Sequence, residues 1–467
     1  TKPYNKPILF KQRNNMADYL DNSQKQIKLA LQLVSGYGGE FQSWRLADSN
    51  ERAYTDIDFY VEMAKTAEQG KIHTLFIADT PSFGGAGGGT DIATRSPAFP
   101  LEPMVMLSAV AYATQKIGMV ATFSTTYNLP YNLARQLKTL DTLSKGRLGW
   151  NTVTTGTPFT AYNFGDKPLP DTTTRYEMAH EMVEAVQTLW GGFGENAYIT
   201  DKATGVFADM SQIKPANYKG KHYQVKGALP IPATPQGQPP IFQAGPSPEG
   251  IELAGRFASG VYANPFTIDE AQAYRNVIKQ SAIQHGRNAD DINMFSGFMF
   301  TIGDTYEEAL ARRMKLIDFM SDEEFYGQIL YLSAMIGVNI HGLDLNEPLP
   351  KSLQNQATPH PHDPRSPRVV ELIKQGMSPK EALANGVINY HPVVVGTAFD
   401  VADFMEEWFK AGATDGFSLA PDSQKGVQDF VEKVVPILQE RGIYHADYEG
   451  STLREHLGVP YQYGLRK

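Results

Sequence analysis

The 467-residue sequence lacks cysteine entirely. This absence excludes disulfide bonds, cysteine-ligated zinc or iron–sulfur centres, and a thiol nucleophile. Long hydrophobic runs are missing too. No stretch approaches the roughly 18 apolar residues of a membrane-spanning helix, and residues 1–25 contain no apolar core of signal-peptide length. We therefore expect a soluble, cytoplasmic protein with no membrane partner.

Positive charge is scarce as well. The 42 Lys and Arg residues are outnumbered by 51 Asp and Glu residues, which gives a net charge of −9. Because the chain has no basic block, it lacks the phosphate attraction that drives non-specific nucleic-acid binding, and no polynucleotide partner is expected. Apolar residues are plentiful at 42%, with 24 Phe and 23 Tyr, which predicts a globular protein with a large core.

Segments with strand character alternate with segments of helical periodicity along the chain. Residues 27–34 alternate apolar and other side chains, and residues 56–69 show helical spacing that ends at Gly70. Alternation of this kind predicts a parallel sheet, and eight such units favour a closed TIM (β/α)8 barrel over an open sheet. The predicted strands are 27–34, 73–79, 116–124, 147–155, 239–245, 259–264, 293–303 and 415–421, and the predicted helices include 56–69, 102–115, 131–144, 174–191, 267–285, 305–319 and 424–441.

Two long stretches interrupt this rhythm, at about 192–237 and 320–400. Loops of this length are commonly lids or binding elements, so we expect both to follow strands on the C-terminal face and to form walls of a substrate cavity. The predicted organisation is an N-terminal extension (1–26), a barrel with these insertions (27–445) and a C-terminal tail (446–467). The glycine-rich run at 84–91 fits neither a dinucleotide-binding fingerprint nor a P-loop, and is expected to be a flexible loop over the barrel mouth.

The predicted strand ends carry mostly neutral hydrogen-bonding side chains. Only Asp79 is ionisable among them, so the carboxylate pair of a glycosidase and the ligand cluster of a hydrolytic metal site are both missing. A mouth of this kind suits a polar heterocycle, although each threonine or asparagine could simply cap a strand or helix. The other strand-end residues are Thr122, Ser124, Asn151, Thr154, Thr155, Gln243, Gly245 and Asn264.

The segment QAGPSPEG (243–250) indicates a phosphate-binding helix start. Gly245 permits close backbone approach, Ser247 can cap a helix and Pro248 suits its first turn. Arg175 and Tyr176 could add a cation and a hydroxyl. An ordinary capped helix and a surface salt bridge of Arg175 are the alternatives. The closely spaced histidines of PHPHD (359–363) have no further ligand set, and no metal is expected.

Several strings resemble bacterial luciferase-like flavin monooxygenases, in particular the group that contains nitrilotriacetate monooxygenase component A, pristinamycin synthase and dibenzothiophene-sulfone monooxygenase. The matching strings are LARQLKTLDTLSKGRLGWNTVTT (133–155), YNFG (162–165), RYEMAHE (175–181), DKATGVFAD (201–209), PATPQGQPPIFQAGPSPEG (232–250) and the ending 426–458. The resemblance covers residues 27–460 and implies a TIM barrel.

The same resemblance implies the cofactor-binding residues. Asp79 and Thr122 match positions beside the flavin ring, Asn132 and Asn151 match polar contacts that line the flavin site, and Tyr176, Gly245 and Ser247 match the ribityl-phosphate end. Thr154, at the same strand end as Asn151, is also expected to bind the cofactor. Some family members carry histidines in the loop after the first strand and at the position of Asn132. This chain does not, so no catalytic acid or base is assigned. The insertion at 320–400 matches no member, which leaves the substrate open.

The implied activity is that of a two-component monooxygenase. Reduced FMN from a separate NAD(P)H:flavin oxidoreductase, delivered by docking or by diffusion, would react with O2 to form a flavin C4a-(hydro)peroxide. One oxygen atom would then enter a small sulfur- or nitrogen-containing substrate. The resemblance also implies a homodimer or homotetramer. A deazaflavin-dependent oxidoreductase on the same barrel and a non-catalytic flavin-binding protein are the alternatives.

Overall fold

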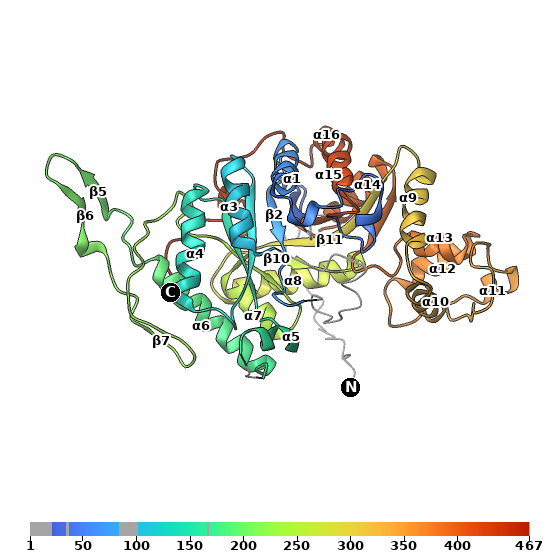
Figure 1. Ribbon diagram of the computed structural model, residues 1–467, viewed down its shortest axis with the longest axis horizontal. Coiled ribbons are helices and arrows are strands. Elements are labelled where there is room, and N and C mark those ends of the chain that lie inside the picture. Colours follow the sequence, from blue (N-terminus) through green and yellow to red (C-terminus); the bar gives the residue numbers. More distant parts are fainter. Residues whose placement is uncertain (1–20, 34–36, 84–100, 166–167, 467) are drawn as a thin grey trace.

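A computed structural model describes residues 21–33, 37–83, 101–165 and 168–466. Nine parallel strands form one sheet, and pairing of β10 with β11 closes eight of them into a barrel, which confirms the predicted fold class (Figure 1). The barrel strands are β1 (Lys28–Gln32), β2 (Thr74–Ile77), β3 (Gly118–Ser124), β4 (Leu148–Val153), β9 (Ile241–Ala244), β10 (Ala258–Ala263), β11 (Asn293–Ile302) and β13 (Gly416–Pro421).

Helices between successive strands surround this barrel. Their apolar faces, together with the outward faces of the strands, make the main hydrophobic core. Within the described ranges, no helix combines the length and apolar character needed to cross a membrane. The surrounding helices are α1 (Ile57–Gln69), α3 (Pro103–Ala113), α4 (Pro130–Leu143), α6 (Thr172–Trp190), α7 (Pro248–Phe257), α8 (Ile268–Gln284), α14 (Ala398–Lys410), α15 (Gln424–Asp429) and α16 (Val435–Glu440), with a short α5 (Pro158–Asn163) before α6.

The inside of the barrel is closed by aromatic side chains. Because side chains alternate along a strand, Phe76, Phe242, Tyr262 and Phe295 point inward, and they pack together in one cluster. Leucines of α17 (Leu453–Leu457), which lies in the predicted C-terminal tail, join this cluster. The barrel therefore has an aromatic floor, and the space above the floor opens at the carboxyl ends of the strands.

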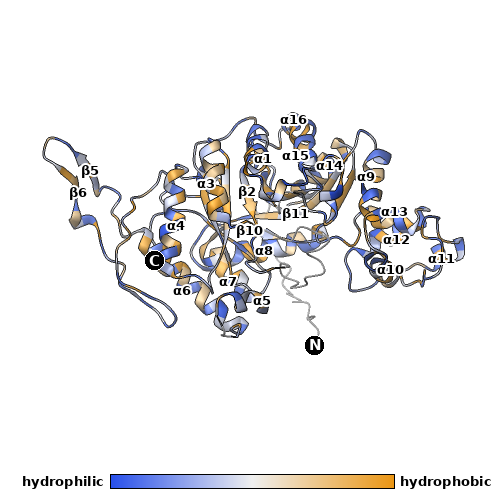
Figure 2. Ribbon diagram, viewed as in Figure 1, coloured by the Kyte–Doolittle hydropathy of each residue, from blue (hydrophilic) through white to orange (hydrophobic). Residues whose placement is uncertain are grey.

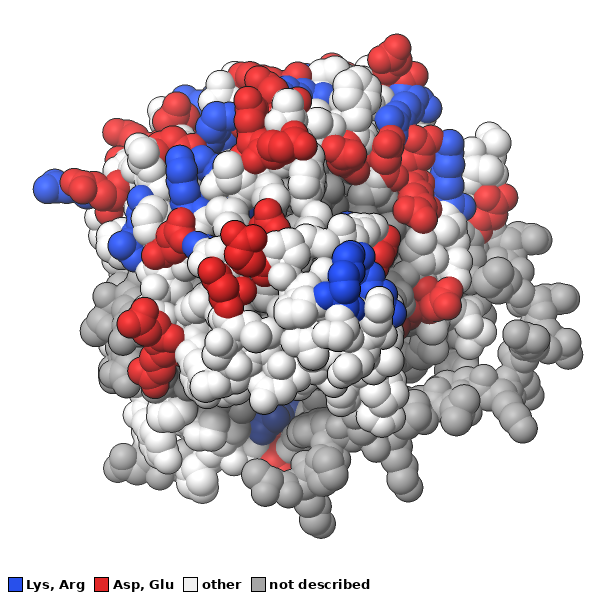
Figure 3. All heavy atoms as spheres, turned by 90° about the vertical axis from the view of Figure 1, so that its right-hand side faces the viewer, with Lys and Arg blue, Asp and Glu red and all other residues white. Residues whose placement is uncertain are grey.

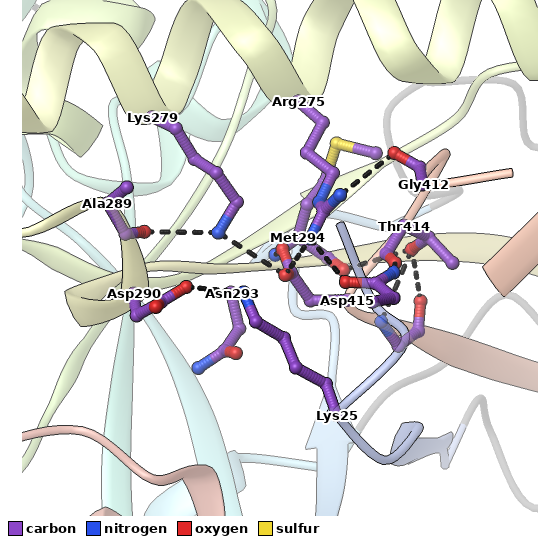
Figure 4. Close-up of polar contacts among 12 residues, drawn as sticks. Lys25, Arg275, Lys279, Ala289, Asp290, Asn293, Met294, Gly412, Thr414 and Asp415 are labelled. Carbon is purple, nitrogen blue, oxygen red and sulfur yellow. Dashed lines mark hydrogen bonds and ion pairs between the residues drawn. The ribbon is translucent and has the colours of Figure 1, made fainter. Parts of the chain in front are cut away.

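A buried ion network joins α8 to the amino-terminal ends of β11 and β13, away from the barrel mouth (Figure 4). Asp415 lies 2.5 Å from Arg275 and 3.2 Å from Lys279, and it also accepts a hydrogen bond from the backbone N–H of Met294. Both cations are fully buried. These contacts hold the pKa of the Asp415 carboxyl well below its usual range despite its burial. Asp415 is therefore ionised in the folded protein.

The stretch 192–237 does not follow a strand, which corrects the prediction. It begins after helix α6, and the hairpin of β5 (Tyr198–Asp201) and β6 (Val206–Ala208) extends away from the barrel (Figure 1). A second hairpin, β7 (Tyr218–Lys219) with β8 (Gln224–Val225), follows. A helix that succeeds a strand runs back toward the opposite end of the barrel, so a segment that starts at its C-terminus starts far from the mouth.

The other long stretch is a small helical unit and not a loop. The unit comprises α9 (Tyr306–Asp318), which lies just before this stretch, and α10 (Asp322–Ile336), α11 (Lys351–Gln356), α12 (Ser366–Lys374) and α13 (Pro379–Ala384), and these helices share a separate hydrophobic core. The chain then forms β12 (Val393–Gly396), which pairs with the end of β11. This unit follows β11 on the C-terminal face, as predicted. On its outer face, acidic and basic side chains are mixed (Figure 3).

Candidate active site

A cavity of about 630 Å³ lies above the aromatic floor at the barrel mouth. Four polar side chains point into the barrel one layer above the floor, and all four line this cavity: Gln32 of β1, Thr122 of β3, Asn151 of β4 and Ser418 of β13. We call this space the mouth cavity. Its floor is apolar and its rim is polar, which is the arrangement of a small-molecule site.

Thr122 and Asn151 face each other across β3 and β4. The Thr122 hydroxyl donates to the backbone carbonyl of Ile77 at 2.6 Å and accepts from Asn151 Nδ2 at 2.9 Å. The Asn151 amide orientation is therefore fixed, and its Oδ1 is buried with no hydrogen-bond partner among the described residues. Tyr262 also lines the cavity, and its buried hydroxyl likewise has no hydrogen-bond partner among the described residues. Each such atom needs a polar ligand or water.

Asp79 follows β2 and lines the same cavity. Partial burial, together with the nearby negative charge of Glu102, raises the pKa of its carboxyl to about 6. A carboxyl with such a pKa exchanges its proton close to neutral pH, so it can hold or release a proton at the cavity wall. Strongly shifted acids of this kind cluster at functional sites.

The end of the cavity near β9 has the geometry of an anion site. Gly245 lines the cavity with φ at +154°, a conformation that favours glycine. Ser247 accepts a hydrogen bond from Gly250 N at 3.1 Å and caps α7. The Tyr176 hydroxyl packs against this turn, since a Cβ atom placed on Gly250 would lie 3.0 Å from it. Helix N-termini attract phosphate groups through their free N–H groups and dipole.

Four of the eight predicted cofactor residues line the mouth cavity, Tyr176 and Ser247 lie beside it at the start of α7, and the other two lie elsewhere. Asn132 is exposed in the first turn of α4, and the half-buried Thr154 accepts a hydrogen bond from Thr126 through its backbone carbonyl. Neither is among the described residues that line the mouth cavity. Arg175 donates to the Pro170 carbonyl and lies beside Gly156, not beside α7. The predicted loop at 84–91 lies outside the described residues.

Residues of the helical unit, of the segment after β1 and of the barrel line a second cavity of about 740 Å³ beside the first. Asn264, Phe266 and Tyr390 line both cavities, so the two spaces adjoin. Its charged groups are paired with each other: Arg313 contacts Glu40 at 2.7 Å, and Arg365 contacts Asp363 at 2.7 Å. Apolar side chains make up most of the remaining wall, namely Phe41, Met299, Leu316, Ile317, Met320, Leu383 and Ile388.

Residues 39–415 match the family described as luciferase-like monooxygenase. Along the chain, the N-acetyl-S-(2-succino)cysteine monooxygenase of Bacillus subtilis (strain 168) is 38% identical, over 94% of this chain and 98% of its own length. Nitrilotriacetate monooxygenase component A of Aminobacter aminovorans is 34% identical, over 94% of this chain and 97% of its own. The chain belongs to the luciferase-like monooxygenase family. The resemblance that the motifs suggested is thus confirmed, and the protein is a flavin-dependent monooxygenase.

Solved structures of similar proteins agree with this assignment. EDTA monooxygenase from Chelativorans sp. BNC1 matches this luciferase-like monooxygenase with a TM-score of 0.76 at 28% identity, over 94% of this chain and 99% of that one. A riboflavin lyase solved with a modified FMN and riboflavin matches with a TM-score of 0.74 at 29% identity, over 93% and 96% of the two chains. Matches to deazaflavin-dependent enzymes are only 15–16% identical and show the fold alone.

Sequence reasoning missed part of the cavity wall of this luciferase-like monooxygenase. Gln32, Ser418, Tyr262 and His391 all line the mouth cavity, yet none was singled out. His391 precedes a run of three valines and Gly396, which is the pattern of the short strand β12. Recognition of that strand would have indicated that His391 lies at the mouth. No three His, Cys, Asp or Glu side chains of the described chain group as a metal site.

Proposed function

We propose that this monooxygenase is the oxygenase of a two-component system. It would take reduced FMN from a separate NAD(P)H:flavin oxidoreductase and insert one oxygen atom from O2 into a small sulfur- or nitrogen-containing compound. The observation that carries the proposal is the mouth cavity, which combines unpartnered polar atoms on β4 and β10 with a candidate anion site where β9 leads into α7. Reduced FMN bound there would supply the electrons that activate O2.

The residues of the mouth cavity fit this cofactor. Asn151 Oδ1 is a fixed acceptor, and the Tyr262 hydroxyl is an available donor for the polar edge of an isoalloxazine. Thr122 orients Asn151, and Asp79 can hold or release a proton beside the ring. At the other end, the Tyr176 hydroxyl, the backbone at Gly245 and the Ser247-capped start of α7 would bind the phosphate. We retain Asn132 and Thr154 only as outer neighbours of the ring.

The second cavity would hold the organic substrate. It adjoins the mouth cavity, and the helical unit forms part of its wall, so a bound substrate would lie next to the flavin. Its mixed apolar and polar lining suits a small organic molecule. The proposed substrate class is supported by the names of the relatives, whose printed substrates contain a thioether sulfur or an amine nitrogen.

A separate reductase is supported by the relative that is named component A. We also propose a homodimer or homotetramer. Helix α3 consists of PMVMLSAVAYA, with no charged residue, and Figure 2 shows it mainly in white and orange. It nevertheless exposes Val105 (74%) and Tyr112 (92%), and an apolar face of this kind on a helix is usually covered by a partner. Light scattering of Tyr112→Glu against wild type would test this.

A substrate screen tests the proposed reaction. The protein is incubated with FMN, NADH, a generic flavin reductase and a panel of thioethers and tertiary amines, and products are measured by mass spectrometry. A gain of one oxygen atom that requires the reductase and O2 is the expected result. Hydride transfer from a reduced deazaflavin without O2 consumption would instead support the deazaflavin-dependent alternative. FMN binding with no turnover of any panel member would support a non-catalytic flavin-binding protein.

The phosphate assignment has a test of its own. Ser247→Ala should weaken FMN binding about 10-fold or more, but should leave riboflavin binding unchanged, because only FMN carries the phosphate. Thr305→Ala is the matched control, since Thr305 caps α9 with the same hydrogen-bond pattern far along the chain. Both variants lose a helix cap worth about 1 kcal/mol. Equal losses for FMN and riboflavin would contradict the assignment.

A further inference from the structure

One imidazole inside the barrel mouth comes from the helical unit and not from a barrel strand. His391 lies two residues before β12, with Pro392 between them, and only 4% of its surface is exposed. On β11, position 297 points inward between Phe295 and Met299, and it is a glycine. A Cβ atom there would overlap the His391 ring. The imidazole therefore occupies the place of the missing side chain in the polar layer.

Gln32 contacts His391 and Ser418. Gln32 Nε2 lies 3.0 Å from Ser418 Oγ and 3.3 Å from His391 Nε2. In the tautomer that accepts the Gln32 hydrogen bond at Nε2, the ring proton is on Nδ1. Burial lowers the pKa of His391 to about 4, so the ring is neutral near pH 7. Nδ1 is buried and has no hydrogen-bond partner in the described part of the chain.

We propose that His391, which borders the mouth cavity, is a hydrogen-bond donor to the flavin ring through Nδ1–H, and that Gln32 and Ser418 help to position it. The proposal rests on the proposed function, because it requires FMN to occupy the mouth cavity. His391 would act opposite Thr122 and Asn151, since β1, β11 and β13 are neighbours on one side of the barrel and β3 and β4 lie together on the other. The ring of FMN would thus be held from two sides by neutral groups.

An unpartnered buried imidazole is not sufficient for this conclusion, as His456 shows. Both ring nitrogens of His456 lack partners among the described residues, yet it belongs to α17 below the aromatic floor. His391 differs because it borders a cavity large enough for a ligand and stands in the polar layer with four other hydrogen-bonding side chains. A buried donor left without a partner destabilises the fold, whereas a ligand acceptor in that cavity would satisfy it.

The test compares FMN binding by four variants of the full chain. His391→Leu removes the donor, and His391→Gln keeps a neutral amide donor. Gly297→Ala keeps the histidine in the sequence, but the added methyl group pushes the imidazole ring out of its position. His456→Gln is the control for loss of a buried neutral histidine. For each, the dissociation constants of oxidised FMN and of anaerobically reduced FMN are measured together with the absorption spectrum of the bound flavin. Circular dichroism confirms that each variant is folded.

We expect FMN binding to weaken about 10-fold in His391→Leu, the usual effect of one lost hydrogen bond, with a changed flavin spectrum. Gly297→Ala should behave similarly, His391→Gln should recover most of the binding, and His456→Gln should match wild type. A folded His391→Leu that binds FMN within about twofold of wild type, with an unchanged spectrum, would overturn the proposal. Failure of the wild-type protein to bind FMN would instead overturn the proposed function.

Discussion

Replacement of Asp79 by asparagine should stabilise the folded protein. Asp79 lines the mouth cavity, where partial burial and the neighbouring charge of Glu102 raise its pKa to about 6 from an ordinary value of 3.8. The folded chain therefore binds the Asp79 proton more tightly than the unfolded chain does. Ionised Asp79 therefore lowers the free energy of unfolding. This loss is complete above pH 6, where the folded and unfolded chains both carry an ionised Asp79, and it is absent below pH 3.8, where both carry a protonated one.

The size of this effect follows from the shift. Each pKa unit corresponds to about 1.4 kcal/mol, so ionised Asp79 costs on the order of 3 kcal/mol at pH 8 and about half of that at pH 5. Solvent reaches part of the side chain, which makes these values upper bounds. Asparagine is isosteric and uncharged. Asp79→Asn should therefore raise the free energy of unfolding by up to about 3 kcal/mol at pH 8 and by clearly less at pH 5.

The assay is denaturant unfolding of FMN-free wild type and Asp79→Asn at both pH values, with oxygenation measured in parallel. A gain in stability that accompanies a loss of activity is the signature of a residue retained for function. The same gain at pH 5 and pH 8 would refute the electrostatic reasoning. Destabilisation at pH 8 would show that the carboxylate makes a structural contact, and unchanged turnover would remove Asp79 from the site.

Three further predictions concern the scaffold. Asp415→Asn should destabilise the protein, in contrast to Asp79→Asn. It should lower the free energy of unfolding, measured with denaturant, by about 3–5 kcal/mol, because it leaves Arg275 and Lys279 buried without a counter-ion. A decrease of less than about 1 kcal/mol would contradict this. Leu453→Ala should cost about 2–5 kcal/mol, since the fully buried Leu453 fills the closed end of the barrel, whereas Leu143→Ala on the exposed face of α4 should be nearly neutral; equal effects would argue against the packing role. Burial lowers the pKa of His456 to about 4, so the wild-type protein should become less stable as the pH falls from about 6.5 toward 4. His456→Gln cannot take up this proton and should remove about 3 kcal/mol of that loss. If the stability of the two proteins changed with pH in parallel, this prediction would be wrong.

The barrel could be predicted because its signals are local. Strand and helix periodicity are visible within ten to twenty residues, and all eight predicted barrel strands match strands of the closed sheet. The helical unit was missed for the same reason. Its helices share a core of their own, and α9 also contacts β11, so helix α9 was assigned to the barrel and α14 was overlooked. Periodicity shows that a helix has an apolar face but not what covers that face.

The residues of the candidate site could be predicted where a polar residue or a glycine lies at the carboxyl end of a predicted strand. Asp79, Thr122, Asn151 and Gly245 are polar or glycine residues at or near strand ends, and all four line the mouth cavity. Gln32 and Ser418 satisfy the same rule on β1 and β13. They were missed because apolar residues follow each of them before its segment ends, and only the closed barrel shows which inward positions share one layer.

The position of His391 could not be predicted from local sequence, because it depends on two segments that are far apart in the chain. Glycine at position 297 leaves a gap in the inward face of β11, and a segment almost a hundred residues later carries the imidazole that fills it. Pairing of β12 with β11 brings the two together, because Met299 pairs with Val393 just after the histidine. The insertion thereby contributes a side chain to the barrel interior as well as a wall to the second cavity. A change in that insertion can therefore alter the substrate cavity and the flavin environment at the same time.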